Sequence, residues 1–196
     1  PETILVENVP DFLRWGLFPQ WRGSLESLGY AVREHVLEAN RYGSAQARSR
    51  MILTARQGAA LHLAPDWGTE RRILEDCIDW DGEHRWSRVA AKSDRMRSRM
   101  RKAQGEAGAR CIWNNVSESR GRPLDGLAPT LTTKSGSQLY LLDGERARIL
   151  NPRELARIQG FPEGYAIPKN RELASKLIGN AIDVHLARGV IEQAIK

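Results

Sequence analysis

A single carboxylate ends an apolar run near the start of the chain. Residues 3–9 read TILVENV, where three aliphatic side chains precede Glu7 and Asn8, and Pro10 follows. The run predicts a buried strand, and open α/β sheets bind ligands at the carboxyl ends of their strands. A half-buried Glu7 would have its acid form favoured by desolvation and could exchange hydrogen bonds with a heterocycle. The alternative is a structural glutamate that accepts backbone N–H groups in the next turn.

Three polar side chains alternate along SAQARSR, residues 44–50. Gln46, Arg48 and Arg50 occupy every second position, so an extended chain would project all three from one face. A glutamine and two guanidinium groups on one face can hold a phosphate or a carbonyl oxygen by forked donation. The alternative is the ordinary polar face of a strand, and neither this segment nor Glu7 decides the function by itself.

The net charge of +6 and the pI near 9.7 conceal an uneven distribution. Residues 82–122 hold eleven Lys or Arg residues and four Asp or Glu residues, so their excess is larger than that of the whole chain. This concentration favours a polyanionic partner, with nucleic acid as the first candidate. The stretch SDRMRSRMRKA, residues 93–103, predicts a basic helix capped by Ser93 or Asp94. The alternative is a solvated helix face.

Composition narrows the class of protein. The 196 residues, 41% of them hydrophobic, suit one domain or two lobes that share a core. No apolar stretch approaches the roughly 20 residues that span a bilayer, and no signal peptide is recognisable. Cys77 and Cys111 form no CxxC pair, and the four histidines lack metal-ligand spacing. We therefore expect no metal, no disulfide framework, no membrane contact and a reducing, cytoplasmic location.

The periodicity of the sequence predicts an α/β arrangement. A broken helix over residues 11–28 ends at Gly29, and Gly43-Ser44 is the turn signal between two strands. A polar, Arg-rich region of little periodicity follows, and Asn151 caps a helix that has Pro152 at its first position. The predicted strands cover residues 3–9, 30–39, 50–56 and 138–143.

The final residues, 170–195, predict one long helix. Its expected buried face carries Leu173, Leu177, Ala181, Val184 and Ile191. Gly179 lies inside this helix at a cost of about 1 kcal/mol relative to alanine. Such a glycine indicates close packing or a ligand against the backbone.

Five short landmarks occur in an order that resembles the C-terminal half of the DNA cytosine-5 methyltransferases. They are Glu-Asn-Val at 7–9, Gln-Ala-Arg-Ser-Arg at 46–50, Arg-Pro at 122–123 before a threonine-rich loop at 124–136, Pro-Arg-Glu at 152–154 before Gln-Gly-Phe-Pro, and Gly-Asn at 179–180. The resemblance implies part of a Rossmann-like S-adenosylmethionine-dependent methyltransferase sheet, a smaller target-recognition lobe and a closing C-terminal helix. The expected ranges are 1–57 for the catalytic part, 58–168 for the lobe and 169–196 for the helix.

The resemblance also implies roles for individual residues. Glu7 would hold a flipped cytosine and protonate its ring nitrogen 3, while Arg48 and Arg50 would hold the target nucleotide. Flipping is required because the reacting carbons are stacked inside the duplex. The cofactor S-adenosylmethionine would lie against Gly179, Asn180 and Ala181. Contacts with double-stranded DNA are expected from Gln46, Arg85, Arg88, Arg95, Arg97, Arg99, Arg101, Arg122 and Thr130.

Two family features are absent from this sequence. The family's nucleophile lies in a Pro-Cys pair, whereas Cys77 follows Asp76 and Cys111 follows Arg110. The glycine-rich cofactor loop is also missing, and Ser44-Ala45 replaces the usual Val-Pro before Gln46. We therefore expect the Pro-Cys pair and the glycine-rich loop either on a second polypeptide or on a removed N-terminal region, in a bacterial or phage setting at the nucleoid.

Two other functions remain open at this point. The first is a non-catalytic DNA-binding or regulatory subunit descended from such an enzyme, and the joint presence of Glu7, Gln46, Arg48 and Arg50 argues against it. The second is a basic α/β RNA-binding module, which would leave the ordered landmarks as coincidence.

Overall fold

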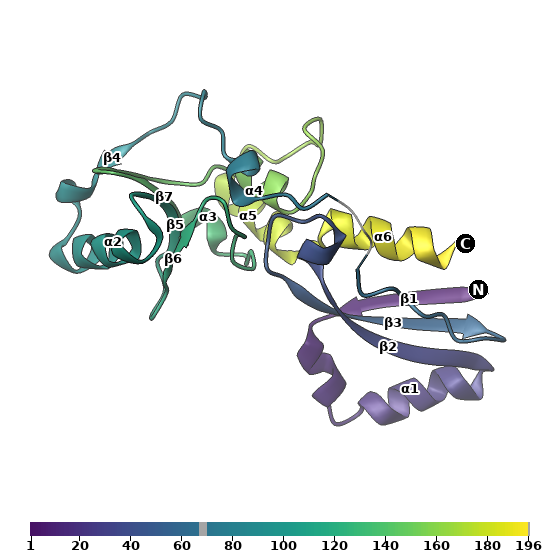
Figure 1. Cartoon of the computed structure of the whole chain (residues 1–196). Helices are drawn as coiled ribbons and strands as arrows, with labels where there is room; N and C mark the ends of the chain where they lie inside the picture. Colours follow the sequence, from purple (N-terminus) through teal and green to yellow (C-terminus); the bar gives the residue numbers. More distant parts are fainter. Residues whose placement is uncertain (67–69, 196) are drawn as a thin grey trace. The chain divides into compact units, whose positions relative to one another are not determined.

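The computed structural model describes residues 1–66 and 70–195, and the chain divides into two compact units (Figure 1). Unit 1 comprises Pro1–Gly43, Arg48–Arg71 and Ile182–Lys196. Unit 2 comprises Ser44–Ala47 and Arg72–Ala181. Each unit is thus assembled from separated segments, and its bounds differ from the three contiguous ranges expected above. The C-terminal residues contribute to both units.

Unit 1 is built on a three-stranded sheet in the order β1-β3-β2. Both β1 and β2 pair antiparallel with β3, so β1 and β2 run parallel to each other and the chain crosses between them through α1. The strands expected from the sequence are therefore confirmed. The elements of unit 1 are β1 Thr3–Asn8, the 3-10 turn η1 Pro10–Arg14, α1 Phe18–Ser27, β2 Tyr30–Glu38, the 3-10 turn η2 Ala39–Tyr42, β3 Ser49–Gln57 and α6 Val184–Ala194.

Helices cover both faces of this sheet, with α6 on one side and α1 on the other (Figure 1). Because side chains alternate along a strand, Met51, Leu53 and Ala55 of β3 pack with Phe18 of α1. Ile52, between them, packs with residues of α6 on the opposite face. This double burial explains why β3 reads as a continuous apolar run.

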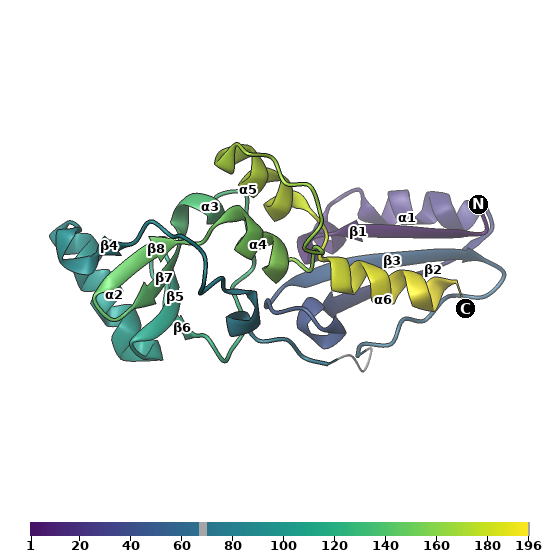
Figure 2. The ribbon, with the colours of Figure 1, turned by 90° about the horizontal axis from the view of Figure 1, so that it is seen from above.

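Unit 2 is built on a five-stranded antiparallel sheet in the order β4-β8-β7-β5-β6. Figure 2 shows α2 beside this sheet. The basic helix expected at residues 93–103 is confirmed as α2, with Ser93 as its N-cap. The elements of unit 2 are the 3-10 turn η3 Leu74–Cys77, β4 Ser87–Arg88, the 3-10 turn η4 Val89–Ala91, α2 Asp94–Ala107, β5 Arg110–Asn114, β6 Gly121–Pro123, α3 Ser135–Gln138, β7 Leu139–Asp143, β8 Arg146–Ile149, α4 Pro152–Ile158 and α5 Arg171–Asn180.

Two hydrophobic clusters lie on the two faces of the unit 2 sheet. On β5, Cys111 and Trp113 pack with Met100 of α2, whereas Ile112 between them joins the cluster around α4. Both faces of the strand are therefore buried, which removes the alternation of polar and apolar residues that marks a half-exposed strand. For this reason β5 could not be recognised in the sequence.

The prediction of one long C-terminal helix is wrong. The chain forms two helices, α5 and α6, and leaves helical conformation at Ala181. Asp183 begins the second helix as its N-cap, because its carboxylate accepts hydrogen bonds from the backbone N–H groups of His185 and Leu186 at 3.0 and 3.1 Å. The expected buried face is wrong too, since Leu173, Leu177 and Ile191 are exposed.

Among the described residues, every helix is too short or too polar to cross a membrane.

Candidate functional site

Glu7 and Arg50 meet across two paired strands of unit 1. The register of β1 against β3 places Glu7 opposite Ile52 and Asn8 opposite Met51, so Arg50 lies one residue beyond the end of this ladder. Arg50 donates from Nε to Glu7 Oε1 at 2.8 Å, with side chains 13% and 32% exposed respectively. The antiparallel pairing thus brings together two landmarks that are distant in sequence. The carboxylate is partly solvated and already bound by a guanidinium group.

Arg48 is buried beside this ion pair. Burial, followed by the like charge of Arg50, lowers the pKa of Arg48 to about 10, and the carboxylates of Glu7 and Asp183 oppose the shift. The guanidinium group therefore stays charged at neutral pH. The four residues form a cluster of two cations and two anions within unit 1.

Asp183 is a member of this cluster that the sequence did not indicate. It is fully buried and caps α6 through the hydrogen bonds described above. Its only sequence signal is an aspartate placed directly before a helical segment, which is a common capping pattern. The helix cap therefore also contributes negative charge near Arg48.

Gln46 takes a different place from the one expected. It belongs to unit 2, where its Nε2 donates to Gln159 Oε1 at 2.6 Å and its Oε1 accepts from the Leu131 backbone at 3.2 Å. The side chain is fully buried. A side chain without exposed surface offers DNA no contact in this arrangement, so Gln46 is better described as joining α4 to the threonine-rich loop.

Two other residues of the expected DNA surface, Thr130 and Arg122, are exposed in unit 2. Thr130 donates from its hydroxyl to the Ala47 carbonyl at 2.6 Å, which ties the threonine-rich loop to the Gln46 segment. Arg122 lies in β6 opposite Ile112, and its side chain is exposed. Both residues therefore stay accessible to a ligand.

Gly179 is explained by close packing. A Cβ atom at this position would lie 2.3 Å from the Thr132 carbonyl carbon, so only glycine allows the threonine-rich loop to approach α5. The neighbouring Asn180 is exposed, and its side chain forms no hydrogen bond with another described residue. The Ala181 carbonyl accepts a hydrogen bond from Gln159 Nε2 at 2.6 Å. Of these three residues, Asn180 offers polar groups to a ligand.

The basic residues of α2 are only partly available. Arg97 pairs with Asp94, Arg101 pairs with Glu145, and Arg99 stacks on Trp113 at 4.9 Å. Arg95 is exposed and has no side-chain partner in the part of the chain that the structure describes. Arg85 and Arg88, which precede α2, are exposed and likewise lack a side-chain partner among the described residues. The unpaired positive charge among these residues thus lies mainly outside the centre of the basic stretch at residues 93–103.

Neither cysteine has the character of a nucleophile. Cys77 and Cys111 are fully buried, and burial raises the pKa of each thiol to about 11. The reactive thiolate is therefore scarce at neutral pH.

Solved methyltransferases share this fold. The Dnmt2 methyltransferase of S. pombe matches 98% of this chain and 66% of its own length, with a TM-score of 0.67 and 20% identity. The Entamoeba histolytica methyltransferase EhMeth matches 100% of this chain and 64% of its own length, with a TM-score of 0.68 and 14% identity. At these identities the likeness shows the fold alone. The chain has the mixed α/β fold of part of a methyltransferase.

The sequence identifies the family. The pattern of the C-5 cytosine-specific DNA methylases matches residues 1–196, and this chain belongs to that family. The Type II methylase M.HgiDII of Herpetosiphon aurantiacus is 30% identical over 230 residues, covering 100% of this chain and 65% of the relative. The Type II methyltransferase M.SsoII of Shigella sonnei is 26% identical, covering 100% of this chain and 53% of the relative. The chain therefore spans about half to two thirds of the length of these relatives.

Proposed function

We propose that this chain supplies the flipped-base pocket and DNA-recognition surface for DNA cytosine-5 methylation. The nucleophile and most of the S-adenosylmethionine site would lie on a polypeptide outside this sequence. The observation that carries the proposal is the cluster of Glu7, Arg48, Arg50 and Asp183, found in a chain of this family. The parallel pair β1 and β2, with β3 inserted antiparallel, supports the interpretation of unit 1 as the C-terminal half of a Rossmann-like sheet.

In this proposal, Glu7 binds the amidine edge of a cytosine held outside the duplex. Its carboxylate accepts from the exocyclic amino group, and its acid form donates a proton to ring nitrogen 3. Protonation draws electron density from ring carbon 6, where the nucleophile of the second polypeptide adds. Arg50 holds the Glu7 carboxylate in position through the 2.8 Å ion pair. Arg48 and Arg50 direct the remaining guanidinium N–H groups to the base carbonyl and the flanking phosphate.

The family uses S-adenosylmethionine, and this chain fits one edge of a site for it. The exposed amide of Asn180 is free to donate and accept among the described residues, whereas the space beside Gly179 is already filled by the threonine-rich loop. When bound, the cofactor supplies the methyl group. Asn180, with the backbone around Ala181, would hold its adenosyl end.

The open edge of β1 supports a second polypeptide. β1 is an edge strand of the three-stranded sheet, and a groove of about 480 Å³ runs beside it, lined in part by Leu5, Arg56 and Ile191. Ile191 of α6 and Ile195, which directly follows that helix, are 50% and 79% exposed. An apolar edge strand beside exposed aliphatic side chains is a site for strand addition. The second polypeptide would add its own strand to β1 and cover these side chains.

A non-catalytic DNA-binding subunit is the second candidate. The observation that favours it is the Glu7–Arg50 ion pair itself, because a salt bridge between adjacent strands can stabilise the sheet without any base present. The two candidates differ in whether Glu7 is needed for turnover.

The test is the substitution Glu7→Gln in an enzyme reconstituted with a polypeptide that carries the Pro-Cys pair and the glycine-rich loop. Glutamine keeps the size of the side chain but cannot deliver a carboxylic proton, so turnover should fall by about 100-fold or more while duplex binding is kept. The matched control is Glu26→Gln in α1, which removes a carboxylate that pairs with Arg22 and leaves the cluster intact. Wild-type turnover by the Glu7→Gln enzyme would contradict the proposal and favour the non-catalytic subunit.

A further inference from the structure

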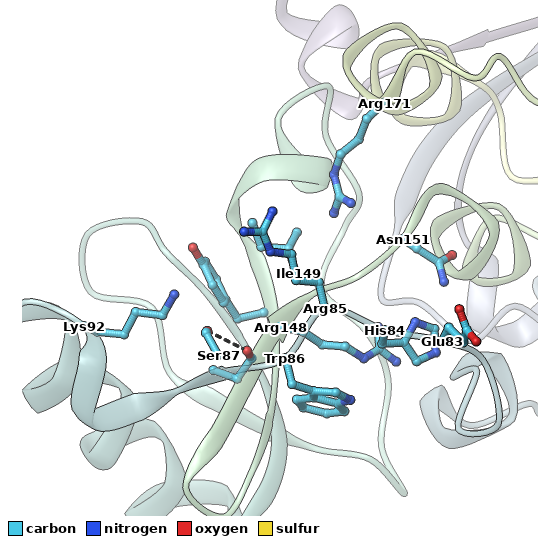
Figure 3. Close-up of a pocket in the computed structure, with 12 residues that line it drawn as sticks. Glu83, His84, Arg85, Trp86, Ser87, Lys92, Arg148, Ile149, Asn151 and Arg171 are labelled. Atoms are coloured by element: carbon cyan, nitrogen blue, oxygen red, sulfur yellow. Dashed lines mark hydrogen bonds between the residues drawn. The ribbon is translucent and has the colours of Figure 1, made fainter.

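A pocket of about 490 Å³ opens in unit 2, and the proposed catalytic cluster takes no part in it (Figure 3). Its walls come from the segment before β4, from the end of η4, from β7 and β8, and from the first residue of α5. Figure 3 shows Lys92 and Arg171 extending toward the centre of the pocket from opposite sides. The residues that carry the argument are Arg85, Trp86, Lys92, Tyr140, Arg148 and Arg171.

The lining is cationic without a matching set of anions. Lys92 and Arg85 form no ion pair with any described residue, and Arg171 donates to the carbonyls of Gly136 and Leu150. Arg148 is neutralised by Glu154, which it contacts through two guanidinium nitrogens at 2.6 and 2.7 Å. The described lining contributes one further carboxylate, that of Glu83. Three cations therefore face the pocket against one anion.

Aromatic rings contact Lys92 and the neutralised Arg148. The Lys92 ammonium lies 5.9 Å from the centre of the Tyr140 ring, and the Arg148 guanidinium lies 5.1 Å from that of Trp86. Such contacts restrict long side chains before a ligand arrives. Burial, with a contribution from the like charge of Arg148, lowers the pKa of Arg171. A bound anion would relieve this repulsion.

We propose that this pocket binds a phosphate group of a DNA strand. The phosphodiester carries one negative charge and oxygens that can accept from Lys92, Arg85 and Arg171 together. The assignment of the phosphate to DNA rests on the proposed function, whereas the charge and shape of the pocket do not. Phosphate contacts of this kind fix the position of a protein on DNA without reading its sequence.

Salt dependence of duplex binding by the isolated chain tests the proposal. The plot of log K against log salt has a negative slope, and each lost phosphate contact reduces its magnitude by about 0.9. Because the pocket holds one phosphate, Lys92→Gln should reduce the magnitude of the slope, and the double variant with Arg85→Gln should reduce it by about 0.9 in all. Lys92→Arg should keep the slope, since it preserves the charge. The matched control is Lys176→Gln, which removes one exposed cation of α5 that does not line the pocket.

A second experiment distinguishes a phosphate of DNA from free inorganic phosphate as the ligand of the pocket. Thermal melting is measured in inorganic phosphate and in chloride at equal ionic strength, and stabilisation by phosphate should be lost in Lys92→Gln. Stabilisation by phosphate together with an unchanged duplex slope would overturn the assignment to DNA in favour of a small phosphate ligand. No effect in either experiment would overturn the pocket as an anion site. Because neither experiment measures methyl transfer, a failure of the Glu7 prediction leaves this test intact.

Discussion

In the proposed site Glu7 would bind both Arg50 and the base, and the geometry of the ion pair is compatible with both contacts. Arg50 binds one carboxylate oxygen through Nε, while about a third of the Glu7 side chain remains exposed. A base that approaches from this open side competes with water for Glu7 and leaves the Arg50 contact in place. In that site the cost of bringing the base to the carboxylate would be the flipping cost of a few kcal/mol, which phosphate contacts would have to offset.

His35 gives unit 1 a pH dependence of stability. Burial, the largest cause, lowers the pKa of His35 below its ordinary value of 6.5, and the charge of His62 adds to the shift. The unfolded chain therefore takes up a proton at a pH where the folded chain does not, so the free energy of unfolding should fall as pH drops below about 6.5. Denaturant unfolding between pH 7.5 and pH 5.5 measures this slope.

The substitution His35→Gln removes the titrating group and should flatten that part of the profile. Glutamine can still donate a hydrogen bond to the Leu61 carbonyl, which His35 Nε2 approaches at 3.4 Å. The acidic side chains titrate at lower pH, so they do not obscure the comparison. An equal slope in wild type and variant would show that His35 is not the source.

At the residue scale, the sequence indicated Glu7, Arg48 and Arg50 through ordered landmarks, and the structure places them close together while their roles stay predictions. It could not predict that Gln46 is buried in unit 2, since alternation along an extended segment fixes the side-chain direction and not what covers it. Asp183 was missed because its role depends on where the helix begins. A helix boundary is the least certain feature of a sequence-based prediction.

At the element scale, the two C-terminal helices show how tertiary contacts override periodicity. Residues 170–195 carry apolar side chains at helical spacing throughout. The helix is nevertheless interrupted, because Asp183 caps a new helix that begins at Val184. In the unit 2 sheet, β7 was predicted as residues 138–143, whereas β5 was missed for the opposite reason. Its two buried faces leave no alternation to read, and its partner β7 is distant in sequence.

Two helical glycines should respond in opposite ways to alanine. Gly179→Ala should destabilise the chain by about 1–3 kcal/mol, because the new Cβ collides with the Thr132 backbone. Gly105→Ala in α2 should stabilise it by about 0.5–1 kcal/mol, because a Cβ there meets no atom within 4 Å. Thermal and denaturant unfolding of the two variants measure the difference. Equal effects of the two substitutions would refute the packing explanation for Gly179.

At the scale of the whole molecule, the proposed chemistry exceeds what this chain contains. The structure brings Glu7 and Arg50 together as the proposed base pocket requires, while both thiols are buried and poorly ionised. The chain also covers 65% and 53% of two relatives in its family. In the proposed function, one partner would account for both the incomplete set of catalytic groups and the open edge at β1: its strand would extend the sheet at β1, and its groups would complete the active site.

We therefore expect the isolated chain to show no methyl transfer to cytosine, and activity to appear when the second polypeptide is added. Ile191→Glu should abolish both complex formation and activity, because it places a charge in the groove beside β1. Leu28→Glu is the matched control, since Leu28 is 70% exposed and does not line that groove.

Size-exclusion chromatography of the mixture and a tritiated-methyl assay provide the two readouts. Thermal melting of each isolated variant checks that the fold is intact. We expect it to be, because Leu28 and Ile191 are already exposed to water. Turnover by the homogeneous wild-type chain would refute the shared active site, whereas undiminished assembly of Ile191→Glu would place the contact elsewhere on the surface.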